Sequence, residues 1–254
     1  MSSLSSVLSD TGLVYSRYLR QTLRSRISML FGLLQPMLFL AFFGPLLEDV
    51  PLGGEGDSWQ TLVPGLLVQL GLFGAAFAGF GIIMEKQLGI VERMRVTPLS
   101  RLALLLGRVL RDATVLLVQS LIVVLAGTAF GLRAPVLGVL ISFVLVAALA
   151  ISLASLSCAF AMRVNTIQEF APVVNSINLP AMLLSGILLP MALAPTWLDV
   201  VSHFVPLRYL VDGVRAAFVG DYGDGSLALG AAVTAALTVV SVTLGTQLFR
   251  KAGA

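Results

Sequence analysis

Long apolar runs separated by short polar segments dominate the pattern along this chain. Six of these runs are about 20 residues long or longer, which is the length a helix needs to cross a hydrocarbon layer. They predict membrane-spanning helices at residues 27–47, 61–84, 113–131, 136–162, 170–189 and 226–249. The predicted fold class is an all-α integral membrane protein, because a helix pairs its own backbone groups where no water can reach.

Small and helix-breaking residues distinguish some of these runs from the others. The second run carries Gly71, Ala75 and Gly79 at every fourth position. Rows of this kind let helices approach closely, so we expect this helix to pack tightly against a neighbour. Gln35 and Pro36 in the first run predict a kink, since proline interrupts the hydrogen bonds of a helix.

The segment 1–26 precedes the first run and has its own periodicity. As a helix it places leucine, valine and tyrosine side chains on one side and Arg17, Arg20 and Arg24 on the other. This pattern is typical of an amphipathic helix at a membrane interface. A cleaved signal peptide is the alternative, but the apolar run starts only after four arginines and lacks a convincing cleavage site.

Composition and charge agree with a membrane protein and suggest its orientation. Hydrophobic residues make up 57% of the chain and charged residues 11%, with a mean hydropathy of +0.97. Given six spans, thirteen of the sixteen lysine and arginine residues fall on the side of the two termini. Basic residues favour the cytoplasmic side, so both termini and the segment 85–112 are predicted to be cytoplasmic.

The segment 85–112 is the longest charged interruption between the apolar runs. Its first part is amphipathic as a helix, Thr97 and Pro98 break it, and a second helix carrying Arg101, Arg108 and Arg111 leads into the third span. Two interpretations follow from this pattern alone. The segment is either a docking surface for another protein or a solvated loop whose basic residues fix the topology.

Catalytic and metal-binding patterns are weak in this sequence. There is no GxxxxGK[ST] phosphate-binding motif. The sole histidine, His203, and the sole cysteine, Cys158, lie in different segments, which argues against a metal site or a nucleophile with a matched base. We therefore expect no catalytic residue, no bound metal and no nucleic-acid partner. The spans also have no carboxylate near their predicted centres, which argues against a proton-coupled transporter.

Two asparagines stand out in the fifth predicted span, which proline and glycine residues also interrupt. Asn175 and Asn178 are polar side chains within an apolar run, and such side chains usually face the protein interior. They either form hydrogen bonds between helices or mark a route for a transported molecule.

The segment 190–225 precedes the last span and lies on the side opposite the termini. It predicts two short helices, at residues 197–204 and 207–219. Arg208, Asp212 and Arg215 share one face of the second helix, at spacings that allow ion pairs.

Two stretches resemble a known family. GIVERMRVTPLSRLALLLGRVLRD, at residues 89–112, resembles the cytoplasmic loop of ABC-2 type transporter permeases, especially the daunorubicin-resistance-like multidrug exporters. PTWLDVVSHFVPLRYLVDGVRAAFVG, at residues 195–220, resembles the region before the last span in the same family. With the six spans and the N-terminal helix, the resemblance covers nearly the whole chain.

The resemblance implies an ATP-driven exporter of a bacterial cell membrane. Two permease copies, identical or different, would form the pathway for a hydrophobic or amphipathic compound such as a drug, natural product or lipid. Two separate ATPase subunits would bind ATP and Mg, and this chain would bind no cofactor. The resemblance further implies that five residues contact the ATPase, namely Glu85, Lys86, Glu92, Arg93 and Arg95.

Two further roles follow from the resemblance. The N-terminal helix would brace against the ATPase, and the helices of 190–225 would dip into the membrane as an outer gate carrying Arg208, Asp212 and Arg215. Two alternatives remain for the function. One is an exporter of polysaccharide or glycolipid from the same family, and the other is an ion-coupled secondary transporter that needs no ATPase.

Overall fold

The computed structural model describes residues 4–47, 57–89, 101–188 and 190–251, and this part of the chain is helical. Its elements are α1 (Leu4–Arg24), α2 (Arg26–Leu47), α3 (Ser58–Ala76), α4 (Gly79–Gln87), α6 (Arg101–Ala129), α7 (Val136–Ala161), α8 (Ile167–Leu184), the 3-10 helix η1 (Met191–Leu193), α9 (Thr196–Ser202), α10 (Pro206–Val219) and α11 (Gly225–Lys251). The predicted all-α class is confirmed for these residues.

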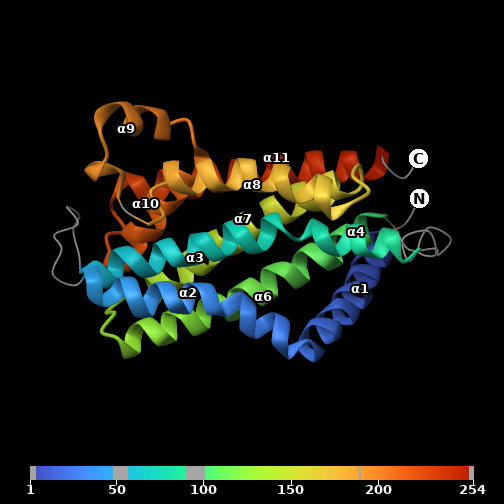
Figure 1. The fold of residues 1–254 in the computed structure, drawn as a ribbon, viewed down its shortest axis with the longest axis horizontal. Coiled ribbons are helices and arrows are strands. Elements are labelled where there is room, and N and C mark those ends of the chain that lie inside the picture. Colours follow the sequence, from blue (N-terminus) through green and yellow to red (C-terminus); the bar gives the residue numbers. More distant parts are fainter. Residues whose placement is uncertain (1–3, 48–56, 90–100, 189, 252–254) are drawn as a thin grey trace.

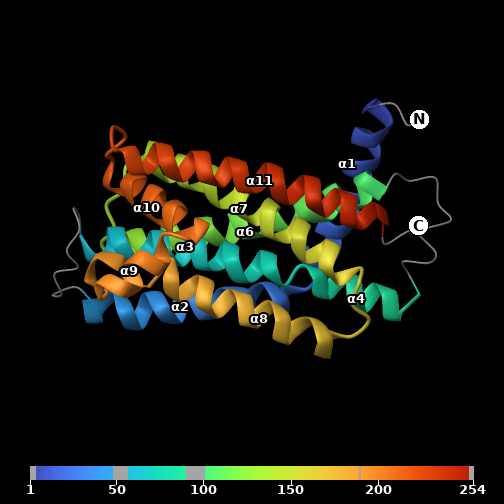
Figure 2. The ribbon, with the colours of Figure 1, turned by 90° about the horizontal axis from the view of Figure 1, so that it is seen from above.

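The long helices lie side by side along the longest axis of the molecule. Figure 1 and Figure 2 show α2, α3, α6, α7, α8 and α11 in this bundle, with α1 lying obliquely at one end. The end of α11 and the helix α4 lie at the same end as α1, whereas α9 and α10 lie at the opposite end. The N-terminal helix and the end of the last helix are therefore on the same side of the bundle.

Within the described residues, four helical stretches are long and apolar enough to cross a membrane. They are Ser58–Gln87, Ala103–Ala129, Val136–Ala161 and Gly225–Leu248. The helix α2 contains a shorter apolar stretch, Gly32–Leu47, and α8, with 18 residues, is not among the four. The membrane class is thus supported, and the first and fifth predicted spans stay predictions.

The boundaries of three predicted spans differ from those in the structure. The helix α8 covers Ile167–Leu184, where a span was predicted at residues 170–189. The predicted span 113–131 is the second part of α6, which begins at Arg101 and continues without a break to Ala129. The predicted span 61–84 is divided into α3 and α4 by a turn at residues 77–78.

A serine from another helix bridges this turn. The Ser157 hydroxyl in α7 donates to the Ala76 carbonyl at 2.5 Å and accepts from the Gly79 amide at 2.9 Å. Both backbone groups belong to the interrupted helix and would otherwise be unpaired inside the bundle. Insertion of a side chain is an established cause of a local break in a helix.

The helix α3 forms the centre of the core and packs against α2, α6, α7, α8 and α10. It begins at a capping box in which Asp57 accepts from the Ser58 amide at 2.8 Å and the Gln60 side chain accepts from the Asp57 amide at 3.1 Å. Nearly every residue from Trp59 to Leu72 is buried. A helix that is buried on all sides is apolar all round, which explains its weak amphipathicity.

The predicted close packing of the small residues is confirmed. An added Cβ at Gly71 would lie 3.2 Å from Leu149 of α7, and one at Gly79 would lie 2.7 Å from the Ser157 carbonyl oxygen. Ala75 is fully buried between them. The row therefore allows α3 and α4 to approach α7 at backbone distance.

A glycine also permits the closest approach between α7 and α10. A Cβ added at Gly138 would lie 1.8 Å from the Ala217 carbonyl oxygen. We expect Gly138→Ala to lower the free energy of unfolding by about 1–3 kcal/mol, because a backbone atom cannot move aside as a flexible side chain can. The midpoint of thermal unfolding in detergent measures this effect.

The matched control is Gly12→Ala in α1, where an added Cβ would meet nothing within 4 Å. Alanine favours a helix over glycine by about 0.5–1 kcal/mol, so this control should leave stability unchanged or raise it. Equal midpoints for Gly138→Ala and the unmodified chain would contradict the packing described for α7 and α10.

Candidate functional site

Three side chains from distant parts of the sequence meet where α1, α4 and α6 converge. Arg108 of α6 forms an ion pair with Glu85 of α4, and it also donates to the Tyr18 hydroxyl of α1 at 2.5 Å. The Tyr18 hydroxyl in turn donates to Glu85 Oε2 at 3.1 Å. We call Tyr18, Glu85 and Arg108 the junction cluster. It links the N-terminal helix to the helices on both sides of the segment 90–100.

Tyr18 and Arg108 of the junction cluster are buried and Glu85 is largely covered, so the three side chains depend on one another. The side chains of Arg108 and Glu85 are 7% and 16% exposed, and Tyr18 is 5% exposed. The Arg108 guanidinium also lies 4.7 Å from the centre of the Tyr18 ring, within cation–π range. Burial raises the pKa of the Tyr18 phenol, although the nearby Arg108 acts in the opposite direction. The phenol therefore stays protonated at neutral pH and can donate to Glu85.

Packing around the cluster fixes α1 against α6. An added Cβ at Gly107 would lie 2.6 Å from Val14, which is buried in the interface between these helices. The Tyr15 hydroxyl lies 3.2 Å from the Thr114 hydroxyl. The apolar side of α1 therefore contacts protein through Val14 and Tyr18, which the sequence pattern alone did not reveal.

Lys86 lies beside the cluster and completes the end of α7. Its Nζ donates to the carbonyls of Met162 and Val164 at 3.2 and 2.7 Å, and to Asn165 Oδ1 at 3.1 Å. A lysine at the end of a helix satisfies carbonyls that have no partner within the helix and offsets their negative charge. Glu85 and Lys86, predicted to contact an ATPase, thus both make interactions within this chain.

The other predicted interface residues are placed only in part. Glu92, Arg93 and Arg95 lie outside the described residues. Arg17, Arg20 and Arg24 are exposed on α1, as the amphipathic pattern predicts. Their contact with a membrane or with another protein stays a prediction.

The two asparagines of α8 lie in different environments. Asn175 is exposed, whereas Asn178 is 4% exposed and its Nδ2 has no hydrogen-bond partner in the described part of the chain. Around them the outer face of α8 is apolar, with Ile177 65% and Leu183 61% exposed. Only Asn175 is therefore available to a molecule at the surface of this chain.

At the opposite end of the bundle, Arg208 joins α9 to α10. It forms an ion pair with Asp199 at 2.7 Å and also donates to the Asp199 carbonyl, the Ser202 hydroxyl and His203 Nδ1. The predicted pairing of Arg208 with Asp212 is present at 3.7 Å. One side chain therefore makes most of the polar contacts that fix the short helix α9.

Arg215, on the same helix, has a different role from the predicted ion pair. It donates to the carbonyls of Gly186 at 2.8 Å, Ile187 at 3.4 Å and Thr61 at 3.4 Å. Gly186 has a positive φ and lies just past the end of α8, where carbonyl groups lack partners within the helix. Arg215 thereby connects α10 to the outer ends of α3 and α8.

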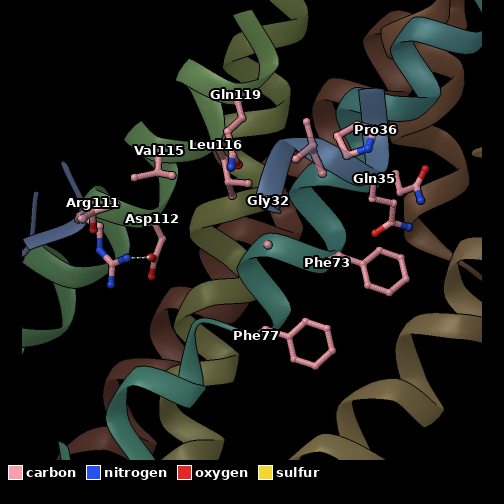
Figure 3. Close-up of a pocket in the computed structure, with 14 residues that line it drawn as sticks. Gly32, Gln35, Pro36, Phe73, Phe77, Arg111, Asp112, Val115, Leu116 and Gln119 are labelled. Carbon is pink, nitrogen blue, oxygen red and sulfur yellow. Dashed lines mark ion pairs between the residues drawn. The ribbon is translucent and has the colours of Figure 1, made fainter. Parts of the chain in front are cut away.

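A cavity of about 390 Å³ lies between α2, α3 and α6, near the end of α1. Figure 3 shows the paired Arg111 and Asp112 on one side and the rings of Phe73 and Phe77 on the other. Five polar side chains of α2, α3 and α6 line the cavity, namely Gln35, Gln69, Arg111, Asp112 and Gln119. This cavity could not be predicted from the sequence, because its glutamines are scattered over three separate apolar runs.

The structure also places Asp112 inside a candidate span rather than before it. Asp112 is 9% exposed, belongs to the stretch Ala103–Ala129, and pairs with Arg111 at 3.0 Å. The expectation that no carboxylate lies near the centre of a span is therefore weakened, because Asp112 lies about one helical turn from the middle of this stretch. Asp112 is buried within a span, and a cation from the same helix neutralises it.

The junction cluster generates a prediction about stability. Arg108→Met leaves Glu85 buried without its cation, so we expect the free energy of unfolding to fall by about 3–5 kcal/mol. Adding Glu85→Leu removes the unpaired charge and should recover most of the loss. Thermal unfolding in detergent measures both effects.

The control for this pair is Arg20→Met, because Arg20 is exposed on α1. Exposed charges usually contribute less than about 0.5 kcal/mol. If Arg108→Met and Arg20→Met changed stability equally, the cluster would not hold α1 to α6 as described.

The contacts of Arg208 generate a second prediction, which concerns local stability. Arg208→Met should free α9 while leaving the long helices intact, so amide hydrogen exchange in residues 196–202 should accelerate about tenfold or more. The control is Arg133→Met, because Arg133 is an exposed arginine at the same end of the helix bundle. Unchanged exchange in α9 would show that other contacts hold this helix.

Comparison with known proteins assigns this architecture to a family. Residues 10–219 match the ABC-2 type transporter family. The matched range contains every described helix from α2 to α10 in full. The chain is 28% identical to the transport permease ycf38 of Cyanophora paradoxa, over 77% of this chain and 69% of that protein. It is 25% identical to the ycf38 permease of Porphyra purpurea, over 81% and 77%.

A further relative has a name that includes a compound. The chain is 24% identical to the doxorubicin resistance ABC transporter permease protein DrrC of Mycobacterium tuberculosis, over 84% of this chain and 78% of that protein. The family matches 210 consecutive positions of this chain, and the described residues include four helical stretches able to span a membrane. This chain belongs to the ABC-2 type transporter family.

Proposed function

We propose that this chain is the membrane subunit of an ATP-driven exporter, with the ATPase carried by a separate protein. The observation that carries the proposal is the family match over residues 10–219. This range includes the segment 90–100 and the two helices that border it, α4 and α6. The relatives named as transport permeases support a role in transport. ATP and Mg would bind to the partner, and this chain would contribute no catalytic residue.

Six membrane crossings fit the arrangement of the helices. Figure 2 shows α2 and α8 running alongside α3, so each extends along the same bundle as the four candidate spans. With six crossings, the basic end that holds α1 and α4 faces the cytoplasm by the positive-inside rule. The helices α9 and α10 then lie on the outer side, where a gate for the pathway would be placed. A bacterial cell membrane is the proposed location.

The ATPase would dock at the segment between α4 and α6, with Glu92, Arg93 and Arg95 as its proposed contacts. The junction cluster supports this mechanism, because it ties the helices on both sides of that segment to α1 through a buried ion pair. Displacement of the segment would therefore move α1, α4 and α6 together. A rigid shift of packed helices is a common way to transmit such a movement.

A second permease copy, identical or different, would complete the pathway. Large apolar side chains are exposed along α2 and α8, for example Phe42 at 69% and Ile177 at 65%. Lipid and a second copy are the two surroundings that suit such surfaces in a membrane. Asn175, exposed on α8, would lie near the pathway if α8 faced the partner copy.

The proposed cargo is a hydrophobic or amphipathic compound, such as a drug, natural product or lipid. The name of the Mycobacterium tuberculosis relative refers to doxorubicin resistance, which supports this class of compound. An exporter of polysaccharide or glycolipid is the alternative within the family. An ion-coupled transporter is less well supported, because the two carboxylates described within candidate spans, Asp112 and Glu85, are paired with Arg111 and Arg108.

The coupling role predicts the effect of reversing charges in the segment. Glu92→Arg combined with Arg95→Glu should reduce binding of the ATPase subunit at least about tenfold, because favourable charge contacts at an interface become repulsive. ATP hydrolysis stimulated by the permease should fall with binding. Co-purification and ATPase assays of the reconstituted complex measure the two quantities.

The control reverses two exposed charges at the opposite end, with Asp221→Arg and Arg133→Glu. This variant should bind and stimulate the ATPase normally. Normal coupling in the Glu92 and Arg95 variant would show that the ATPase docks elsewhere. Transport by the purified chain under an ion gradient, with no ATPase present, would contradict the proposed function itself.

A further inference from the structure

The cavity between α2, α3 and α6 has polar groups at both ends and an apolar middle. Arg111 and Asp112 lie at the end near α1, and Gln119 lies two helical turns further along α6. Gln119 is seven positions after Asp112, which corresponds to about 10 Å along a helix. Between these ends Val115 and Leu116 line the cavity from α6, and Phe73 and Phe77 line it from the opposite side.

The packing register places Gln69 at the same end as Gln119. The helices α3 and α6 run in opposite directions, with Gly74 against Leu116 and Val63 against Gly127. Gln69 therefore lies near the level of Gln119. The helix α2 reaches this end at Gly32, where an added Cβ would lie only 2.6 Å from Gln119 Nε2. The lack of a side chain at Gly32 leaves room for the Gln119 amide at the wall of the cavity.

Several polar atoms of the cavity wall lack partners. Among the described residues, Gln69 Oε1, Asp112 Oδ2 and Arg111 Nε make no hydrogen bond. Gln69 is 5% exposed and Asp112 is 9% exposed, so both are desolvated. A buried polar group without a partner is costly, and a bound molecule that supplies the missing partner removes that cost. Gln69 Oε1 and Asp112 Oδ2 both accept hydrogen bonds, so they favour a ligand that carries hydrogen-bond donors.

The charges around the cavity indicate that the ligand is uncharged. Asp112 is paired with Arg111, and the nearby Arg108 is paired with Glu85. Neither ion pair leaves a net charge to balance a charged ligand, and a buried charge without a counter-charge is strongly disfavoured. Hydroxyl or amide groups satisfy the unpaired oxygens without this penalty.

The aromatic side chains indicate the shape of the ligand. The Phe73 and Phe77 rings have centroids 6.4 Å apart and planes 29° apart, and Phe77 continues the contact to Phe80 at 5.0 Å. Aromatic rings offer flat apolar surfaces that stack with other rings. The volume of about 390 Å³ lies within the range of sites for small molecules.

We propose that this cavity binds an uncharged, elongated amphipathic compound with a flat apolar body and hydrogen-bond donors at both ends, about 10 Å apart. One end contacts Asp112, and the other contacts Gln69 and Gln119. The compound is the cargo in this proposal, which therefore rests on the proposed export function. The cavity gives each permease copy a binding site within its own helices.

The experiment uses a matched series of photoreactive probes on the full chain in lipid nanodiscs, without any ATPase. 4,4′-Dihydroxybenzophenone has donors at both ends, 4-hydroxybenzophenone has one, and benzophenone has none. Mass spectrometry of the labelled peptides gives the site and extent of reaction. We expect the dihydroxy probe to label residues 69–77 and 111–119 about 25-fold more than benzophenone, since each of its two hydrogen bonds contributes roughly a factor of five.

Two variants test the site from different directions. Gln69→Leu keeps the size of the side chain and removes an acceptor, so labelling by the dihydroxy probe should fall about fivefold while benzophenone labelling is unchanged. Val115→Trp fills the cavity and should reduce labelling by all three probes. Ser241→Ala is the control, because it removes a buried hydroxyl without a partner in α11, outside the cavity lining.

The outcomes separate this inference from the function proposed above. Equal labelling by the three probes, or labelling that Gln69→Leu and Val115→Trp leave unchanged in folded protein, would overturn the site. Labelling of the cavity by a diazirine phosphatidylcholine that the dihydroxy probe cannot displace would assign it to membrane lipid instead. If the chain failed to couple to an ATPase but the probes still labelled the cavity, the export mechanism would be rejected and the binding site would be retained.

Discussion

Backbone groups that lose their helical partners inside the bundle are paired by side chains from other helices, and the arrangement of the molecule depends on this constraint. In a membrane no water is available for an interrupted helix, so each break needs a polar side chain at a fixed position. Ser157 bridges the turn between α3 and α4, Lys86 completes the end of α7, and Arg215 completes the end of α8. Each of these contacts joins helices that are far apart in the sequence.

The same constraint explains why charged residues in this chain are structural as well as topological. The basic residues at the end of the bundle that holds α1 and α4 were expected to mark orientation, yet Lys86 and Arg108 both have partners within the protein. At the opposite end Arg208 and Arg215 likewise bind backbone carbonyls. Once a guanidinium or ammonium group pairs with carbonyls and carboxylates inside the bundle, it defines a single packing of the helices.

The sequence predicted the features that depend on neighbouring residues, and it missed those that depend on distant ones. The apolar runs, the amphipathic α1 and the small residues at Gly71 and Gly79 were recognised because their patterns repeat within one helix. The α8 boundaries were placed less well, since prolines and asparagines interrupt its run. The partners of Glu85 could not be predicted, because Tyr18 and Arg108 come from separate helices.

The course of α6 was partly predicted, because the sequence indicated a second helix carrying Arg101, Arg108 and Arg111 that leads into the third span. One signal that the two form a single helix is that no proline lies between Arg101 and Ala113. The cavity had no such signal. Gln35, Gln69 and Gln119 each appear as a single polar residue in an apolar run, and their convergence depends on the register of three helices. A single glutamine more often forms a bond between helices than a binding site.

The unbroken course of α6 has a thermodynamic consequence for the proposed exporter. The beginning of this helix adjoins the segment proposed to receive the ATPase, and its middle lines the cavity. If binding of the ATPase shifts α6, this shift changes the affinity of the cavity for its ligand. Linkage then requires the ligand to change the affinity for the partner by the same factor. Binding of the ligand in the cavity would thus change the affinity of the segment for the ATPase through α6 itself.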